Sequence, residues 1–429
     1  MDKYLIKYLI ETADDELSKK YIDFFKVELD WHTYISETHM SEPYHRDNKA
    51  GTTEKLKKIY QYTDAIVKTK NSNTNKSKVL STLKVPQSYM KPFIKLGLEY
   101  YSPIWHPLGK KNIFGDYKTL KWHKNIQDRI RNAEFHSFLD KNFHKDLEEF
   151  QQYFLNQYKE QDFKALFLYT DQYFYSKYFI DVFKKLNKPS FVFTHGLPGI
   201  YSKAIDNRSD YLMVWSEKIK ANYINAGFDS NKIHVVGHPI HYNLEKEKFL
   251  KSDTSNILVI PVSSITWHQH EYDNTVVNDV SMVVLYLYKV QKVLAKLGIK
   301  NARYRPHPTI NKKWIKPFLD PDFYILDNEP LELSLKKSSL VIGANSTIVL
   351  EALMQGINYI AFDPKDEGGL NMTGYKSVPP FDGSEEKLVM ATNEEELEKY
   401  IKDSKMTDYS LVHDFIQNLD LSIIKQLIN

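Results

Sequence analysis

The sequence predicts two successive α/β domains, each built on a parallel β-sheet. Short apolar runs of strand length alternate with helix-length segments from about residue 163 to 240, and a second alternating series runs from about residue 256 to 405. The stretch between them, NLEKEKFLKSDTSN at 243–256, is polar and charged and is a candidate interdomain linker. A length of 429 residues is enough for two or three domains of ordinary size.

Composition narrows the class of protein. The chain has 58 Lys and Arg against 55 Asp and Glu, and this near balance argues against a nucleic-acid partner. Aromatic residues make up 14%, which argues against intrinsic disorder. The absence of cysteine excludes a disulfide scaffold, a thiolate zinc site and a cysteine nucleophile. Because the chain has neither a membrane-span pattern nor a signal-peptide pattern at its start, we expect a soluble, cytoplasmic protein.

The first 160 residues are less regular. We predict a first strand over Tyr4–Ile10, followed through Asp14 and Asp15 by a helix. The run from Lys68 to Lys84 carries five lysines and no acid, and its lack of periodicity favours a mobile surface loop. The alternative is an electrostatic contact with anionic lipid headgroups or an anionic glycan, which would place the protein peripherally at the inner face of the membrane.

From about residue 163 the predicted elements follow in order. The first domain has strands in FKALFLYT, KPSFVFTHG, YLMVWSE and KIHVVGHP, with helices ending near Leu186 and Ala226. The second has strands in NILVIPVSS, ARYRPHP, FYILDN, SLVIGANS and NYIAFDP, and the stretch to about Leu297 is a predicted long helix. We place the domain boundaries at 1–245 and 250–405, with 406–429 as a closing helix.

Ligands of open parallel sheets bind beyond the carboxyl ends of the strands, so we searched those ends for unusual residues. His195 follows a buried strand in Thr-His-Gly-Leu-Pro-Gly, where the glycines allow a ligand to approach. Imidazole accepts a proton near neutral pH, which makes His195 a candidate general base. A turn histidine that only bonds the backbone is the alternative. Asp171 and Glu217 also stand near strand ends and are alternative bases.

The strand ARYRPHP ends in a second candidate site. Two prolines fix the backbone on either side of His307, and Arg305 adds a permanent positive charge. A histidine donor beside a cation suits a phosphate group. The alternative is a rigid turn without a ligand.

Two further strand ends favour anions. Ser346 and Thr347 stand at a predicted helix start, where free N–H groups and hydroxyls attract an anion. Glu351 lies one turn further on nearly the same face, where it can accept hydrogen bonds from ribose hydroxyls. Ordinary helix capping with a surface glutamate is the alternative. Ser263 and Ser264, after the first strand of the second domain, could contact a diphosphate.

Other common sites find little support in the sequence. His268 and His270 diverge on the predicted helix, so we do not expect them to bind zinc. Asp320-Pro321-Asp322 is a predicted turn rather than an acid pair for a metal. The dinucleotide, P-loop and hydrolase-elbow motifs are absent. We therefore predict no metal and no cofactor.

Four segments in order carry a family resemblance: THGLPG at 194–199, DYLMVWSEKIKANYINAGFDSNKIHVVGHP at 210–239, RYRPHP at 303–308 and GANSTIVLEAL at 343–353. Together they resemble GT-B-fold transferases of bacterial surface-polysaccharide synthesis, over about residues 165 to 365. These include CDP-glycerol glycerophosphotransferases and sialyl-, polysialyl- and Kdo transferases. The resemblance implies two Rossmann-like domains with a central cleft, the first binding the acceptor and the second the nucleotide donor.

The resemblance also implies roles for individual residues. His307 would contact the donor phosphate, Ser346 and Thr347 the same phosphate or the leaving oxygen, and Glu351 the ribose. His195 would be the base toward an acceptor hydroxyl. The sequence departs from glycerophosphotransferases by having Leu-Pro after His195-Gly196, and it lacks the acidic motif from which sialyltransferases often draw their base. These departures leave the donor and the base open.

The predicted function is glycosyl transfer in capsule or lipopolysaccharide synthesis, independent of metal. The predicted donor is nucleotide-activated, with CMP- or CDP-linked donors favoured, and the acceptor is a glycan or a lipid-linked glycan. A CDP-glycerol-type glycerophosphotransferase, a UDP-sugar epimerase and a non-catalytic glycan-binding assembly protein are the alternatives.

Overall fold

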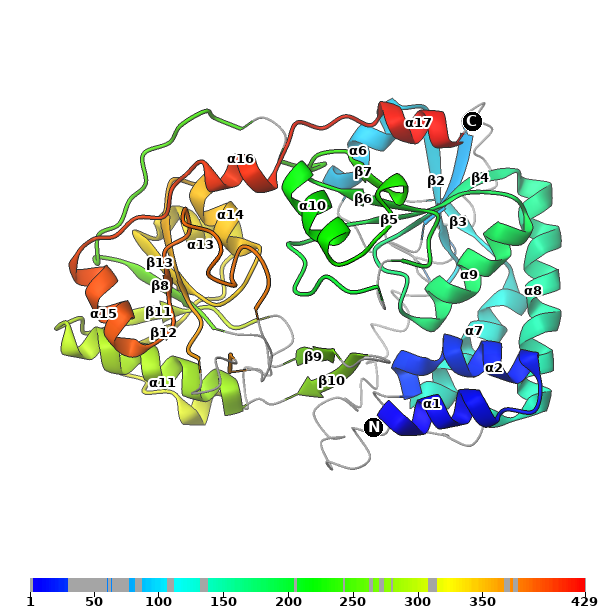
Figure 1. Ribbon diagram of the computed structural model, residues 1–429, viewed down its shortest axis with the longest axis horizontal. Coiled ribbons are helices and arrows are strands. Elements are labelled where there is room, and N and C mark those ends of the chain that lie inside the picture. Colours follow the sequence, from blue (N-terminus) through cyan, green and yellow to red (C-terminus); the bar gives the residue numbers. More distant parts are fainter. Residues whose placement is uncertain are drawn as a thin grey trace.

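The computed structural model confirms the predicted α/β class and shows two parallel sheets, one in each half of the chain (Figure 1). It describes residues 3–29, 60, 63, 77–81, 87–105, 112–131, 138–203, 207–241, 244–261, 265–269, 274–278, 281–307, 315–365, 371–372 and 377–428. Ser263, Ser264, His270 and most of the predicted lysine-rich loop lie outside these residues.

The first half contains a seven-stranded sheet of order β3-β2-β1-β4-β5-β6-β7, in which every pair is parallel. Its strands are β1 (Ser77–Ser81), β2 (Leu98–Pro103), β3 (Asn112–Phe114), β4 (Phe163–Leu168), β5 (Ser190–Phe193), β6 (Tyr211–Val214) and β7 (Ile233–Val235). Its helices are α1 (Lys3–Thr12), α2 (Glu16–Phe24), α6 (Gln87–Lys95), α7 (Tyr117–Arg131), α8 (Lys141–Gln161), α9 (Phe174–Lys185) and α10 (Glu217–Asn225), with a 3₁₀ turn η2 (Ser230–Lys232).

The second half contains a six-stranded parallel sheet of order β12-β11-β8-β13-β14-β15. Its strands are β8 (Ile257–Ile260), β11 (Ala302–Tyr304), β12 (Tyr324–Leu326), β13 (Leu340–Gly343), β14 (Asn358–Phe362) and β15 (Met390–Ala391). The remaining elements are the hairpin β9 (Ile265–Gln269) and β10 (Asn274–Asn278), helices α11 (Ser281–Lys296), α13 (Leu331–Lys337), α14 (Ile348–Met354), α15 (Glu394–Lys402), α16 (Leu411–Phe415) and α17 (Ser422–Ile428), and η3 (Lys316–Phe318).

Two predictions for the N-terminal region are wrong. Tyr4–Ile10 belongs to helix α1 and not to a strand, because a short apolar run fits either structure and here it packs beside α2. The predicted helix after Asp15 is confirmed as α2, whose first turn Asp15 caps by accepting a hydrogen bond from Ser18 N at 2.8 Å. Within the predicted lysine-rich loop, Ser77–Ser81 forms β1, which lies between β2 and β4.

Two predictions for the second half also need correction. The predicted long helix begins only at Ser281, because the chain before it forms the antiparallel hairpin β9–β10. This hairpin pairs Thr266 with Val277 and Trp267 with Val276, residue types that favour strands. His268 therefore lies on a strand and not on a helix. The predicted closing helix at 406–429 is two short helices, α16 and α17.

The last helices connect the two halves. Helix α16 packs between α10 of the first half and α14 of the second. Side chains of both halves, including Trp215, Phe415 and Leu350, belong to one continuous buried cluster. Helix α17 then returns to the first half of the molecule (Figure 1). Its Ile424 belongs to the same buried cluster as Phe93 and Phe193. The chain therefore crosses between the halves twice, which fixes the position of one sheet relative to the other.

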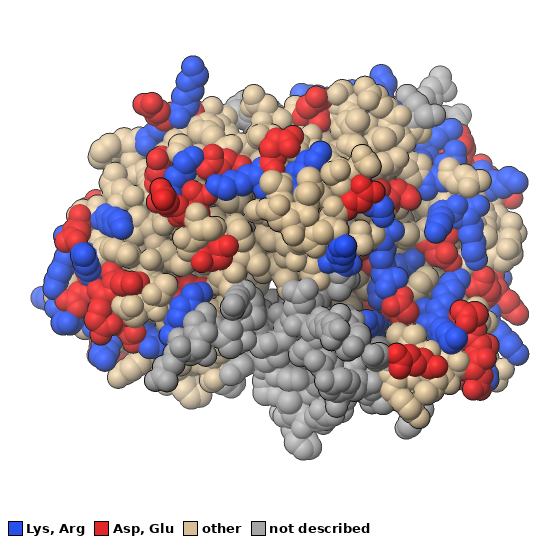
Figure 2. All heavy atoms as spheres, in the orientation of Figure 1, with Lys and Arg blue, Asp and Glu red and all other residues tan. Residues whose placement is uncertain are grey.

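The surface shows no dominant sign of charge on the face in Figure 2, where lysine and arginine side chains are interspersed with aspartate and glutamate. This distribution matches the near-balanced composition of the chain. None of the helices in the described residues is long and apolar enough to span a membrane.

Candidate functional site

The strand order of the second sheet locates its ligand-binding edge. The chain runs from β8 outward to β11 and β12 and then crosses back to β13 on the other side of β8. Ligands of such sheets bind at this switch point, beyond the carboxyl ends of the strands. The backbone N–H of Ala344 donates to the carbonyl of Ile260 at 3.0 Å, so the segments leaving β13 and β8 lie side by side. Ser346 and Thr347, which are predicted to stand at a helix start, come two and three residues after Ala344.

Ser346 and Thr347 occupy the start of α14, as predicted, but their hydroxyls have different contacts. The Ser346 Oγ accepts a hydrogen bond from Ile348 N at 3.3 Å, which closes a local turn before the helix. The Thr347 Oγ1 accepts a hydrogen bond from Leu197 N at 2.7 Å. Leu197 belongs to the His195 loop of the first half. The second contact therefore joins the two loops that the sequence predicted separately.

Gly196 explains how closely the two loops approach. A Cβ atom at this position would lie 2.9 Å from the Thr347 Oγ1, which is nearer than real Cβ contacts allow. Only glycine lets the backbone after β5 come this close to the start of α14. His195, immediately before Gly196, is thereby held at the boundary between the two halves.

The His195 ring is exposed to solvent and still contacts protein on one side. Its centroid lies 4.9 Å from that of the Tyr169 ring, and Tyr169 follows β4, the strand next to β5. Surrounding protein lowers the pKa of His195, while a hydrogen bond to the backbone carbonyl of Tyr169 works in the opposite direction. The lowered pKa keeps the His195 ring neutral at pH 7, and a neutral imidazole has one ring nitrogen that can accept a proton.

The two alternative bases have different surroundings. Asp171 is fully buried, and its Oδ2 accepts hydrogen bonds from the backbone N–H groups of Arg208 and Ser209, the latter at 3.3 Å. A carboxylate used in this way organises the chain before β6. Glu217 is the exposed first residue of α10, after the cap residue Ser216.

Arg305 and His307 follow β11, as predicted. Nη1 of Arg305 lies 3.3 Å from Asp327 Oδ1 and 2.5 Å from the carbonyl of Glu329. Half-buried His307 has its pKa lowered by burial, so its ring is neutral at pH 7. The positive charge at this strand end therefore comes from Arg305, while the His307 ring is neutral.

Glu351, in the first turn of α14, is half-buried rather than a surface residue. Burial raises the pKa of its carboxyl group, and the charge of Arg305 lowers it. The structure thus brings Arg305 and Glu351, 46 positions apart in the sequence, into one electrostatic neighbourhood.

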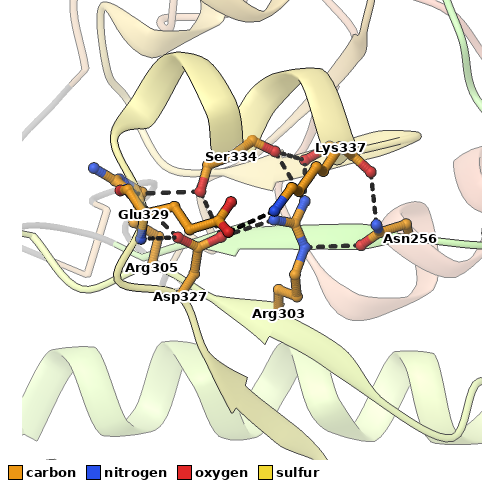
Figure 3. A network of polar contacts seen from close by, with 8 residues as sticks. Asn256, Arg303, Arg305, Asp327, Glu329, Ser334 and Lys337 are labelled. Atoms are coloured by element: carbon orange, nitrogen blue, oxygen red, sulfur yellow. Dashed lines mark hydrogen bonds and ion pairs between the residues drawn. The ribbon is translucent and has the colours of Figure 1, made fainter.

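Sequence reasoning missed two polar clusters at the same edge of the sheet. In the first, Asp327 follows β12 and contacts Arg303 and Arg305 (Figure 3). In the second, Asp363 follows β14 and accepts hydrogen bonds from Asn345 Nδ2 at 3.1 Å and Ser377 Oγ at 2.6 Å. The strand-end rule that selected Ser346 would also have selected both aspartates, since FYILDN and NYIAFDP were predicted strands.

In the described part of the chain, no three His, Asp or Glu side chains lie close enough together to hold a metal ion. Asp320 lies in a turn, as predicted, and its carboxylate accepts hydrogen bonds from Asp322 N and Gln291 Nε2.

Comparison with known proteins yields neither a matching family model nor a matching curated protein. Solved structures with some similarity include a UDP-GlcNAc 2-epimerase from Methanocaldococcus jannaschii, at 16% identity and a TM-score of 0.44 over 82% of this chain and 98% of that one. The lipopolysaccharide outer core galactosyltransferase WaaB gives 13% identity and a TM-score of 0.42 over 82% and 99%. Since both scores are below 0.5, the fold assignment rests on the strand order of the two sheets.

Proposed function

We propose that this protein is a GT-B-type glycosyltransferase of bacterial surface-polysaccharide synthesis. It transfers a sugar from a nucleotide-activated donor to a glycan hydroxyl, and CMP-linked sugars such as sialic acid or Kdo are the favoured donors. Residues 1–245 bind the acceptor and residues 250–405 bind the donor. The acceptor is a glycan or a lipid-linked glycan, presented at the cytoplasmic face of the membrane.

The observation that carries this proposal is the contact between Leu197 N and Thr347 Oγ1. It puts a neutral, oriented imidazole from one half next to a helix start from the other half. Group transfer from a nucleotide needs a base for the incoming hydroxyl and an anion site for the outgoing phosphate, and both must face the same reacting carbon.

In the proposed reaction, the free ring nitrogen of His195 takes the proton of the acceptor hydroxyl. The acceptor oxygen bonds to the anomeric carbon as the bond from that carbon to the phosphate oxygen breaks. The electron pair of that bond leaves with CMP. Arg305 and His307 stabilise the phosphate charge, and Glu351 accepts hydrogen bonds from the ribose hydroxyls.

Arg305 supplies the charge that a divalent cation supplies in many transferases, so we propose that transfer is independent of metal. Turnover should survive EDTA treatment followed by desalting. Loss of turnover in EDTA, with recovery on adding Mg²⁺ or Mn²⁺, would refute this part of the proposal.

The first experiment is a thermal-shift screen with CMP, CDP, UDP and GDP, because a ligand that binds only the folded state raises the melting temperature. We expect the largest shift with CMP. The matching CMP-sugar is then incubated with and without a glycan acceptor, and release of CMP should require the acceptor.

The same assays separate the alternatives. A shift with CDP and transfer of glycerol phosphate would identify a glycerophosphotransferase. Conversion of a UDP-sugar without any acceptor would identify an epimerase. Glycan binding that survives His195→Ala and His307→Ala, with no turnover of any donor, would identify a non-catalytic assembly protein.

A further inference from the structure

We propose that Asp327 is a positioning residue, which locks Arg305 so that the free edge of its guanidinium group forms part of a phosphate-binding site beside Glu351. This inference rests on the proposed function for the identity of the anion, a donor phosphate. The observation that supports the inference is that two arginines, Arg303 and Arg305, contact the same buried carboxylate of Asp327 (Figure 3).

The arrangement starts from β11. Arg303 lies in β11 and Arg305 directly follows this strand, two positions further on, and both side chains reach the same carboxylate, that of Asp327. Asp327 follows the neighbouring strand β12, and its backbone N–H donates to the carbonyl of Tyr304 at 2.8 Å. The carboxylate is thereby placed between the two guanidinium groups.

The Asp327 carboxylate is almost fully buried and all of its bonding capacity is used. Its Oδ2 lies 2.8 Å from Arg303 Nη1 and also accepts from the Ser334 hydroxyl. Its Oδ1 accepts from Glu329 N at 3.1 Å and lies 3.3 Å from Arg305 Nη1. With hydrogen bonds and ion pairs from four residues, the carboxylate has one fixed orientation.

The two arginines have different surroundings. Arg303 uses its whole guanidinium group within the network, since Nε bonds Asn256 and Nη2 bonds Ser338. In the described part of the chain, every side-chain hydrogen bond of Arg305 uses Nη1. Among the described residues, Nε and Nη2 of Arg305 make no hydrogen bond within the network, so this edge of the guanidinium group can donate to a ligand.

Charge and position identify the ligand class. Two guanidinium groups share one carboxylate, so Arg303, Arg305 and Asp327 together carry a net charge of +1 at the edge of the sheet. The charge of Arg305 reaches Glu351 on α14, next to the switch point of the sheet. A fixed, planar pair of N–H donors with a net positive charge matches the oxygens of a phosphate group. Held by Asp327, Arg305 needs no reorganisation when the donor binds.

The test compares Asp327→Asn with Arg303→Gln as a matched control that disturbs the same network from its other side. Binding of CMP, CDP and inorganic pyrophosphate is measured by calorimetry, well below the unfolding temperature of each variant. We expect Asp327→Asn and Arg305→Gln to weaken binding about tenfold or more, the effect of losing a well-aligned charged contact. Arg303→Gln should change binding by less than about threefold, although it also lowers the melting temperature.

A double-mutant cycle separates positioning from general stability. Asp327→Asn should weaken binding no further when Arg305 is already glutamine, because its effect passes through Arg305. The proposal is overturned if the losses of affinity in the cycle are additive, or if Asp327→Asn and Arg303→Gln lose equal affinity. It is also overturned if Asp327→Asn binds the probes as the unmodified protein does, or if the unmodified protein binds none of the three probes. Asp327-dependent pyrophosphate binding without transfer of any sugar would leave this site standing and refute only the proposed reaction.

Discussion

The carboxyl edges of the two sheets differ in chemistry although the strand orders of the sheets are alike. At the first edge, His195 contacts the ring and the backbone carbonyl of Tyr169. At the second, Arg305 lies within electrostatic reach of Glu351 and is tied to Asp327. The shared topology thus determines where a site can form. The residue types at the strand ends determine whether that site can bind an anion or take up a proton.

The two histidines sharpen this comparison because the surrounding protein lowers the pKa of both rings by desolvation. Both rings are therefore neutral at pH 7. His195 lies at the carboxyl edge of the first sheet, and its motif Thr-His-Gly-Leu-Pro-Gly contains no arginine. A neutral imidazole in such surroundings is suited to removing a proton. His307 is two residues from Arg305, which suits donation to a phosphate.

The largest expected effect tests the first edge. His195→Ala should lower turnover by about 10²–10⁴ and leave nucleotide affinity unchanged, because a base contributes to the rate and not to donor binding. In the unmodified protein the rate should fall as the pH drops through a value below 6.5, the direction that the lowered pKa of His195 requires, and this limb should vanish in the variant. Steady-state rates across pH, with calorimetry for affinity, check both statements. Full activity of the His195→Ala variant would mean that His195 is not the base, and that Glu217 or Asp171 has this role instead.

The next effect contrasts one half-buried glutamate in each half of the chain, Glu28 and Glu351. Glu28 accepts a hydrogen bond from Phe174 N at 2.9 Å, at the start of α9, and burial raises its pKa to about 7. The unfolded chain loses this proton near 4.5, so the free energy of unfolding should fall by about 3 kcal/mol as the pH rises from about 4.5 to 7. Glu28→Gln should remove this pH dependence in urea unfolding experiments.

Glu351→Gln is the control for the second half. Arg305 opposes the effect of burial on the Glu351 pKa, so this substitution should flatten the stability profile less than Glu28→Gln does. Equal flattening by both substitutions would show that Arg305 does not compensate Glu351.

The third effect tests the second edge. His307→Ala should weaken nucleotide binding by about ten- to a hundredfold, the effect of losing a hydrogen bond to a charged group, and lower turnover as well. Binding to the unmodified protein should strengthen as the pH falls, because a bound phosphate favours the protonated imidazole. Calorimetric titrations at several pH values measure both. Loss of affinity in His195→Ala equal to that in His307→Ala would mean that the two edges do not divide the roles.

The smallest effect concerns the contact between the edges. Thr347→Val keeps the shape of the side chain but removes the acceptor for Leu197 N, which should cost about 1 kcal/mol in the free energy of unfolding. Thr347→Ser keeps the acceptor and should cost less. Denaturant unfolding of both variants measures the difference, and equal losses would show that the hydrogen bond contributes nothing.

Local sequence predicted most strands of both sheets and most of the candidate site, because these strands are apolar runs that end in turns. His195, Arg305, His307 and Ser346 were selected by one rule, that polar residues after buried strands lie at the carboxyl edge of a sheet, and Glu351 was selected by its helical spacing to Ser346. Asp327 and Asp363 follow predicted strands too, and they show that the rule was applied too narrowly rather than that it failed.

The sequence by itself determined the α/β class, the division into two halves and the residue types at the strand ends. Tertiary structure decided what local pattern does not encode. It made the polar segment Ser77–Ser81 a central strand, because pairing with β2 and β4 outweighs its weak local preference. It joined Leu197 to Thr347 across 150 positions and set Asp327 between two arginines. Contacts between distant segments depend on how the sheets pack, and periodicity along one segment carries no information about its distant partner.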